Sequence, residues 1–177
     1  PNEWRSNNKR TFLNIGACDY ETIVYVNGNK AGTHFGGYTP IRIDITPWIV
    51  DGENDITICA KDNPQDFSIP SGKQSSELKS YGCFYTRTTG IWQTVWLETM
   101  PTKHIHGLKI TPDAHTKTVK IQAECGGEEM TITVFDGEQT LLSQTFTSET
   151  LLQADFELWS PENPKLYTFT ITSNSGD

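Results

Sequence analysis

Short runs in which apolar and polar residues alternate at every second position set the tightest limit on how this chain folds. Residues 22–26, 41–45 and 167–172 show the alternation clearly, and this is the period of a β-strand with one buried face. Turn pairs such as Asn27-Gly28 and Asp136-Gly137 separate runs of this kind about every eight to twelve residues. Because no segment keeps a helical period for more than about two turns, the pattern predicts an all-β protein made of sandwiches.

The charge of the chain argues against nucleic acid and anionic membrane surfaces as partners. Its 177 residues carry 14 Lys and Arg against 22 Asp and Glu, a net charge of −8, whereas both partners select for clustered basic side chains. No run approaches the roughly 18 consecutive apolar residues that a membrane-spanning helix needs. Residues 1–5 lack the basic and apolar segments of a signal peptide. A bacterial periplasmic or secreted location stays open, and it depends on a signal peptide carried by a longer parent protein.

The cysteines and histidines form no motif typical of a metal or cofactor site. Four widely spaced cysteines include no CxxC pair: Cys18, Cys59, Cys83 and Cys125. Three of them close apolar runs, which favours buried free thiols over zinc ligands, and a disulfide would need an oxidising compartment. His104 and His106 share one strand face without a third ligand nearby in the sequence, so we expect surface positions for them. We predict no metal site and no cofactor.

A change in sequence pattern, to more regular and more Thr-rich alternation, divides the chain into two modules, residues 1–100 and residues 101–177, with a linker at residues 100–103. The second module carries five or six short, Thr-rich strands, as an immunoglobulin-like sandwich does. In the first module, residues 91–97 are apolar on both faces, which predicts a central strand. A loop rich in Pro, Gly and Ser spans about residues 62–79, and a loop of that length is more often functional or disordered than without a role.

Several motifs, in collinear order along the chain, carry a family resemblance. They are Val-Asn-Gly at 26–28, Gly-Thr-His-Phe-Gly-Gly-Tyr-Thr-Pro at 32–40, Ile-Asp-Ile-Thr at 43–46, Pro-Ser-Gly-Lys-Gln at 70–74, Tyr-Thr-Arg-Thr-Thr-Gly-Ile-Trp-Gln-Thr-Val-Trp-Leu-Glu at 85–98, and Leu-Trp-Ser-Pro-Glu-Asn-Pro-Lys-Leu-Tyr at 158–167. The first module resembles the sugar-binding domain of glycoside hydrolase family 2, the β-galactosidase and β-glucuronidase family. The second resembles the immunoglobulin-like domain of that family.

The resemblance implies a partial jelly-roll sandwich (galactose-binding-like) over residues 1–100, truncated at its N-terminus. An immunoglobulin-like β-sandwich over residues 101–177 would follow, lacking its last strand. Both truncations would expose unpaired strand edges, so we expect a homodimer through those edges.

In the family these modules precede a (β/α)8 barrel with two catalytic glutamates, which act about 5 Å apart in a retaining glycosidase. This chain has no room for such a barrel, which takes roughly 200 residues or more. Its Asn2-Glu3 pair lies in the first module and does not match the acid/base of the barrel. The resemblance therefore implies a non-catalytic portion of a retaining glycoside hydrolase, inactive alone and with no catalytic residue of its own.

In that parent the chain would brace the downstream barrel of the same polypeptide and contribute a loop, around residues 74–87, to the rim of the active site. The expected partners are this barrel and the carbohydrate substrate. Two alternatives stay open. One is an independent carbohydrate-binding module, and the other is an adhesin-like pair of scaffold domains, because sandwiches host many functions.

Relatives place an acidic, sugar-contacting residue six positions before the glycine of the Gly-Ile motif, and here that position is Phe84. A ring can stack on a sugar face but cannot accept hydrogen bonds from its hydroxyl groups. The candidate carbohydrate-binding residues are Tyr81, Phe84, Tyr85 and Arg87. For Arg87 the favoured role is a buried ion pair that ties the first module to its neighbours, which suits its planar guanidinium.

Three further side chains have a structural and a functional interpretation. His34 could touch a sugar hydroxyl, but ordering its Gly-rich loop is the favoured role. Trp92 and Trp96 share one strand face and could form a stacking platform. Packing against another layer, in the core or at a module interface, is the favoured role for both.

Overall fold

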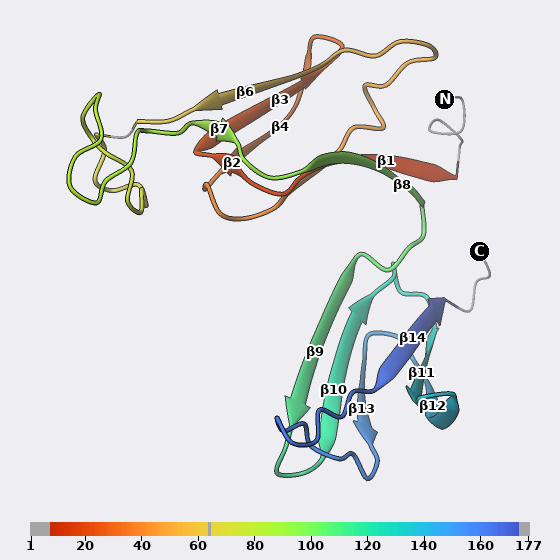
Figure 1. The fold of residues 1–177 in the computed structure, drawn as a ribbon. Helices are drawn as coiled ribbons and strands as arrows, with labels where there is room; N and C mark the ends of the chain where they lie inside the picture. Colours follow the sequence, from red (N-terminus) through yellow and green to blue (C-terminus); the bar gives the residue numbers. More distant parts are fainter. Residues whose placement is uncertain (1–7, 64, 174–177) are drawn as a thin grey trace. The chain divides into compact units, whose positions relative to one another are not determined.

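The structure, a computed structural model, describes residues 8–63 and 65–173. The chain forms two compact units, Pro1–Thr102 and Lys103–Asp177. Every regular element in the described ranges is a β-strand, and every pair of strands is antiparallel (Figure 1). The prediction of an all-β protein is therefore confirmed. The Asn2-Glu3 pair and the end of the chain after Ser173 lie outside the described residues.

The first unit contains three small sheets, with strand orders β5-β1-β8, β4-β3-β6 and β2-β7. The strands are β1 (Lys9–Ile15), β2 (Cys18–Asp19), β3 (Glu21–Val26), β4 (Asn29–Phe35), β5 (Ile41–Asp44), β6 (Ile56–Lys61), β7 (Gly90–Ile91) and β8 (Val95–Pro101). Asn27 and Gly28 have φ values of 50° and 78°. Two consecutive positive φ values suit the tight turn of a hairpin, so the Asn-Gly pair joins β3 to β4 as predicted.

The core of the first unit follows from the alternation of its strands. Val24 and Val26 point inward from β3 and have no exposed surface. Side chains from four other segments complete this cluster: Leu13, Ile15, Cys18, Ile41, Ile45 and Ile49. The strands of this unit therefore bury one face and leave the other to solvent, as the period of two requires.

The prediction of a central strand at residues 91–97 is wrong. The segment divides into β7 and β8, and in the described part of the chain β8 pairs with β1 alone, at the edge of its sheet. Trp92 and Trp96 are 54% and 44% exposed. The apolar character of both faces therefore does not reflect burial inside this unit, and the interpretation of these tryptophans as core residues is wrong.

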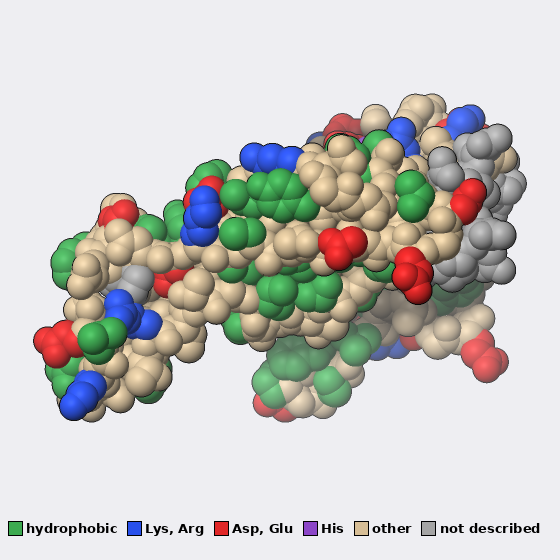
Figure 2. Space-filling model, turned by 90° about the horizontal axis from the view of Figure 1, so that it is seen from above, with side chains coloured by type: hydrophobic (Ala, Val, Ile, Leu, Met, Phe, Trp, Pro, Cys, Tyr) green, Lys and Arg blue, Asp and Glu red, His purple; other side chains and the backbone are tan. Residues whose placement is uncertain are grey.

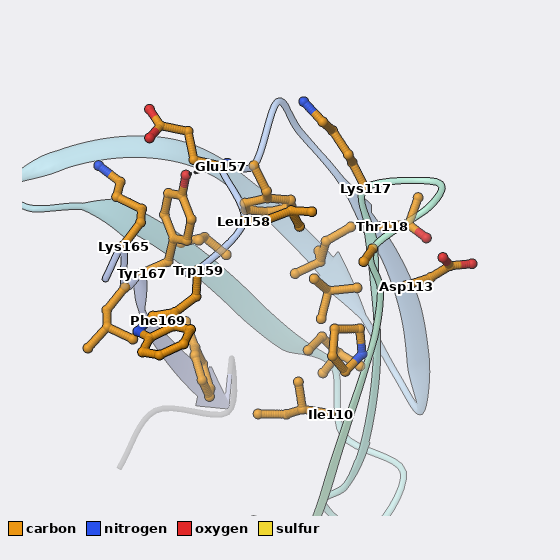
Figure 3. Close-up of a pocket in the computed structure, with 18 of the residues that line it drawn as sticks. Ile110, Asp113, Lys117, Thr118, Glu157, Leu158, Trp159, Lys165, Tyr167 and Phe169 are labelled. Carbon is orange, nitrogen blue, oxygen red and sulfur yellow. Dashed lines mark hydrogen bonds between the residues drawn. The ribbon is translucent and has the colours of Figure 1, made fainter. Parts of the chain in front are cut away.

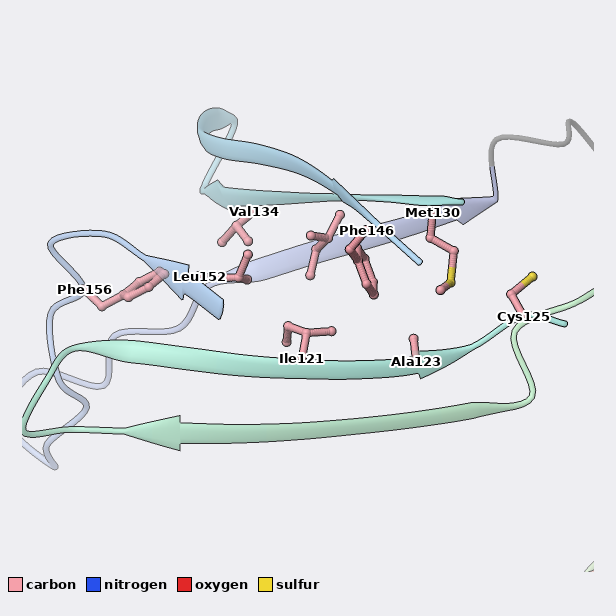
Figure 4. Packing of buried hydrophobic residues seen from close by; sticks show 9 residues of the cluster. Ile121, Ala123, Cys125, Met130, Val134, Phe146, Leu152 and Phe156 are labelled. Atoms are coloured by element: carbon pink, nitrogen blue, oxygen red, sulfur yellow. The ribbon is translucent and has the colours of Figure 1, made fainter. Parts of the chain in front are cut away.

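The second unit is a two-sheet sandwich with strand orders β13-β10-β9 and β12-β11-β14. The strands are β9 (Gly107–Asp113), β10 (Thr118–Glu124), β11 (Met130–Asp136), β12 (Gln139–Phe146), β13 (Glu149–Gln153) and β14 (Thr168–Ser173). Ile121 and Ala123 of β10 face Met130 and Val134 of β11 across the core (Figure 4). The predicted turn at Gly137, with φ of 58°, connects β11 to β12.

The sandwich of the second unit is open on one side. A cavity of about 570 Å³, the open cavity, lies between its sheets and is lined by the core residues Ile121 and Ile132 together with the exposed side chains of Trp159 and Leu166. Figure 3 shows Phe169 on one side of this cavity and Ile110 on the other, from β14 and β9. In the described ranges both strands pair on one edge only.

All four cysteines are free thiols. Cys18 and Cys125 are buried, as predicted, and Cys59 is partly buried, whereas Cys83 is exposed in a loop. Among the described residues, no helix is long and apolar enough to cross a membrane. The same residues contain no group of three or more His, Cys, Asp or Glu side chains arranged to hold a metal ion.

Candidate functional site

The candidate site lies in and beside the long loop, residues 62–89, which connects β6 to β7. The loop extends beyond the ends of these strands (Figure 1), and hydrophobic, acidic and basic side chains mix on its surface (Figure 2). It includes the exposed side chains of Phe67 and Leu78. The predicted loop of residues 62–79 is thus part of a longer one that contains all four candidate residues.

Two of the candidates form a pair within the loop. The rings of Tyr81 and Phe84 lie with their centroids 5.2 Å apart, and the amide of Phe84 donates a hydrogen bond of 2.9 Å to the carbonyl of Tyr81. Gly82, with φ of 53°, makes the tight turn between them possible. Both rings are partly exposed, so the pair presents an aromatic edge to solvent.

Backbone hydrogen bonds hold Tyr85 against an earlier part of the same loop. Its amide donates to the carbonyl of Lys73 at 2.8 Å, and its carbonyl accepts from the amide of Ser75 at 2.7 Å. Ser75 is fully buried. The loop therefore folds back on itself, with residues 73–75 beside residue 85.

Arg87 is half-buried, and it forms no ion pair with any residue that the structure describes. The interpretation of Arg87 as one half of a buried ion pair thus finds no partner within this part of the chain. Its charge acts on Asp62: burial and the nearby carboxylate of Asp19 raise the pKa of Asp62, while a hydrogen bond from Thr89 and the charge of Arg87 partly offset that rise.

A glutamine fixes the long loop to the body of the first unit. The side-chain amide of Gln74 donates to Asp19 Oδ2 at 3.0 Å, and its carbonyl oxygen accepts the backbone N–H of Thr88 at 3.0 Å. Asp19 belongs to β2 and is only 7% exposed. We call these two hydrogen bonds the Gln74 clamp, because they join the middle of the loop to a buried carboxylate and to Thr88 near the end of the loop.

Beside the clamp lies a pocket of about 290 Å³, the Tyr38–Trp92 pocket. Its lining consists of Asp19, Gly37, Tyr38, Ser71, Gly72, Lys73, Gln74, Tyr85, Thr88 and Trp92. The rings of Tyr38 and Trp92 meet edge to face with centroids 6.0 Å apart, and the indole N–H of Trp92 donates to the carbonyl of Gly37 at 2.8 Å. Of the four candidate residues, only Tyr85 lines this pocket.

The glycine-rich segment beside the pocket leaves no space for a side chain at Gly37. A Cβ atom on Gly37 would lie 2.5 Å from Asp19 Oδ1, closer than real Cβ contacts come. Next to it, His34 Nε2 and Thr39 Oγ1 are 3.0 Å apart in a hydrogen bond across the turn. This contact confirms the structural role predicted for His34.

The lining of the pocket suits binding. Aromatic rings offer flat apolar faces, while Lys73 offers an ammonium donor beside them. Asp19, Tyr38 and Lys73 are not among the candidate residues predicted from the sequence. The Pro-Ser-Gly-Lys-Gln motif at residues 70–74 was the signal for Lys73 and Gln74, but no local pattern pointed to Asp19.

Comparison with known proteins shows one consistent family. The family model for glycosyl hydrolases family 2 matches residues 103–177. A protein of Formosa agariphila named "Putative beta-glucuronidase" is 32% identical over 93% of this chain and 21% of its own length. A β-galactosidase of Clostridium acetobutylicum is 29% identical over 96% of this chain and 19% of its own length.

Solved structures agree with the sequence matches. A β-glucuronidase of Bacteroides uniformis superposes with a TM-score of 0.75 at 25% identity, covering 98% of this chain and 23% of that one. A β-glucuronidase of Ruminococcus gnavus gives a TM-score of 0.75 at 22% identity, covering 99% of this chain and 32% of that one. The chain thus spans about a fifth to a third of the length of these relatives.

Proposed function

We propose that this chain, which belongs to glycosyl hydrolase family 2, is the non-catalytic portion of an enzyme that hydrolyses O-glycosidic bonds. Its partner would be a catalytic (β/α)8 barrel in the same polypeptide, and the substrate of that barrel would be a carbohydrate. The length of the match supports this proposal, because the chain corresponds to only 21% and 19% of two curated relatives.

The second part of the proposal is that the long loop contributes to the rim of the active site of that barrel. The Gln74 clamp is the observation that carries it. A loop that touches a substrate must keep its position to be useful in catalysis. One hydrogen bond of 3.0 Å holds Gln74 to the buried Asp19, and a second of 3.0 Å holds Thr88 to Gln74. Tyr81, Phe84, Tyr85 and Arg87 remain the proposed sugar-contacting residues.

The purified chain should cleave no nitrophenyl glycoside faster than buffer alone, because the two carboxyl groups of a retaining site would belong to the barrel. Release of nitrophenol at 400 nm measures this, with a complete family 2 β-glucuronidase or β-galactosidase as the positive control. Cleavage that rises in proportion to the concentration of the chain would refute the proposal.

The open cavity supports the further proposal that the second unit takes one more strand from the same polypeptide. Such a strand would lie along the edge of β14 opposite β11 and cover the core residues Ile121 and Ile132 that line the cavity. Adding a strand to an exposed edge satisfies backbone groups and buries alternate apolar side chains at once. This strand would also help the chain to brace the barrel.

With that edge free, the isolated chain should self-associate. Light scattering should give a mass above that of the monomer, and the mass should fall on dilution. Leu166→Ser should raise the dissociation constant at least about tenfold, because it removes apolar surface at the mouth of the open cavity. Leu78→Ser, a matched change at an exposed position of the long loop, should leave it unchanged. A monomeric mass at all concentrations would contradict the prediction.

A further inference from the structure

We propose that Asn27 is a modification site, which loses its side-chain amide as ammonia when the turn around it opens. Asn27 is the one asparagine of the chain that precedes a glycine. Because glycine has no Cβ, its backbone nitrogen is the least hindered of all residues toward the side chain before it. Such a site needs neither a catalytic barrel nor a substrate, so it goes beyond the proposed function of the chain.

The reaction uses only atoms of the turn and water. The backbone nitrogen of Gly28 attacks Cγ of Asn27, a C–N bond forms in a succinimide ring, and the bond from Cγ to Nδ2 breaks. The proton that the attacking nitrogen gives up is balanced by the one that the departing ammonia takes up. Water then opens the ring at one of its two carbonyl carbons. The products are aspartate and isoaspartate, and the latter lengthens the backbone by one methylene group.

In the folded chain, three hydrogen bonds hold the Asn27 side chain in one orientation. Its Nδ2 donates to the carbonyl of Trp48 and to Asn54 Oδ1, both at 2.8 Å. Its Oδ1 accepts the backbone N–H of Asp55 at 2.9 Å. We call these three bonds the Asn27 network, and they use both hydrogen atoms of the amide. Cγ can turn toward the nitrogen of Gly28 only when the side chain leaves these partners, so the closed turn protects the site.

The partner Asn54 is itself fixed, so the network cannot adjust around it. Its Oδ1 also accepts the N–H of Val50 at 2.8 Å, and its Nδ2 donates to the carbonyls of Val50 and Gly52 at 2.9 and 3.2 Å. Exchanging the oxygen and nitrogen of Asn54 would set like groups against each other at these contacts. Asn54 therefore offers an acceptor to position 27 and requires a donor there.

Loss of the amide keeps the turn from closing again as before. A carboxylate at position 27 has no hydrogen to donate, so its oxygens would face two acceptors, the carbonyl of Trp48 and Asn54 Oδ1. The contacting segment already carries three acidic side chains: Asp51, Glu53 and Asp55. The added charge is therefore repelled by its surroundings. Each modified molecule stays open at this end of the β3–β6 ladder, where Val26 pairs with Ile56, and the modification accumulates as a record of past opening.

The test compares deamidation of the purified chain in its native state with that of the same chain unfolded in urea, at mildly alkaline pH. Digestion at acidic pH stops the reaction, and mass spectrometry of the fragments detects the replacement of NH₂ by OH. In urea, Asn27 should be the first asparagine to react. In the native state it should react at least about tenfold more slowly, because reaction then requires local opening.

A variant that loosens the network should speed the reaction in the native state. Asn54→Ala removes one partner of Asn27 and should raise the rate at Asn27 at least about fivefold. Asn163→Ala, the same substitution at an exposed position of the second unit, should leave that rate unchanged. In case Asn54→Ala unfolds the first unit altogether, the unaltered chain is also followed below its urea transition. There the rate should rise with urea, since opening becomes more frequent.

The effect of the product on the fold is read from Asn27→Asp. Its first unit should melt at least about 5 °C below that of the unaltered chain, because two donors are lost from the network. Asn29→Asp is the matched control, since it adds the same charge in the same turn at an exposed side chain that contacts only the carbonyl of Asn27 among the contacts the structure gives it. Its melting temperature should fall by less.

Any of four results would overturn the proposal. Equal rates at Asn27 in the native chain and in urea would show that the Asn27 network gives no protection. Earlier reaction of other asparagines in urea would show that Asn27 is not the preferred site. An unchanged rate in a folded Asn54→Ala variant would separate protection from the network. An unchanged melting temperature of Asn27→Asp would show that the product fits the closed turn.

Discussion

Replacing Gln74 with glutamate should destabilise the first unit by about 2 to 4 kcal/mol at neutral pH, because it sets a second carboxylate against the buried one of Asp19. The side-chain amide of Gln74 lies 3.0 Å from Asp19 Oδ2, so the new carboxylate cannot avoid its neighbour without releasing the loop. Two like charges in one site raise the pKa of one of them. The loss of stability should therefore be full above that raised pKa and should shrink as the pH falls through it.

Thermal unfolding at several pH values measures this effect, and limited trypsin digestion at Lys73, Lys79 and Arg87 reports whether the loop has detached. Gln65→Glu is the matched control, since it makes the same change of charge at an exposed position of the same loop. Equal melting temperatures for the two variants at pH 7 would show that the Gln74 clamp contributes nothing to the stability of the first unit.

Ile132→Ala should destabilise the second unit by about 2 to 5 kcal/mol, the range for removing a fully buried isoleucine. Ile132 lies in the middle of β11, has no exposed surface, and lines the open cavity. The cavity already leaves one side of this small core without partners, so a sandwich of this size has little stability to lose. We expect the second unit to melt in a transition of its own, below that of the first.

Calorimetry and the fluorescence of Trp159, the one tryptophan of the second unit, follow this transition. Ile110→Ala tests the reasoning with the same substitution in the same cavity. Ile110 is 43% exposed on β9, so its loss should cost less than about 1 kcal/mol. If the two variants have the same melting temperature, the burial of a side chain in this unit does not determine how much stability its truncation costs.

The fold was predictable where local pattern and burial coincide. β3 alternates and ends in an Asn-Gly pair, and both its inward side chains and its hairpin follow from that sequence alone. The prediction of a central strand at residues 91–97 was wrong because apolar side chains on both faces predict burial on both sides. Whether a second layer covers such a strand depends on chain segments far away, which the strand's own sequence does not encode.

The candidate site was predictable only in part for a similar reason. The family motif located Tyr85 and Arg87 within the long loop, because motifs are local. Asp19, which anchors that loop, lies 55 positions from Gln74 in the sequence. A contact of that range leaves no periodic or local signature, so only the folded chain brings the two side chains together.

The pairing of β1 with β8 has a practical consequence for how the first unit can be built. These strands pair along their whole length, from Lys9 with Pro101 to Ile15 with Val95, while the long loop lies outside that ladder. A break in the exposed part of the loop therefore separates β7 and β8 from the other strands in sequence but not in space. Two fragments divided after Lys79 would therefore carry complementary strands, β1 and β2 on one and β8 and β7 on the other.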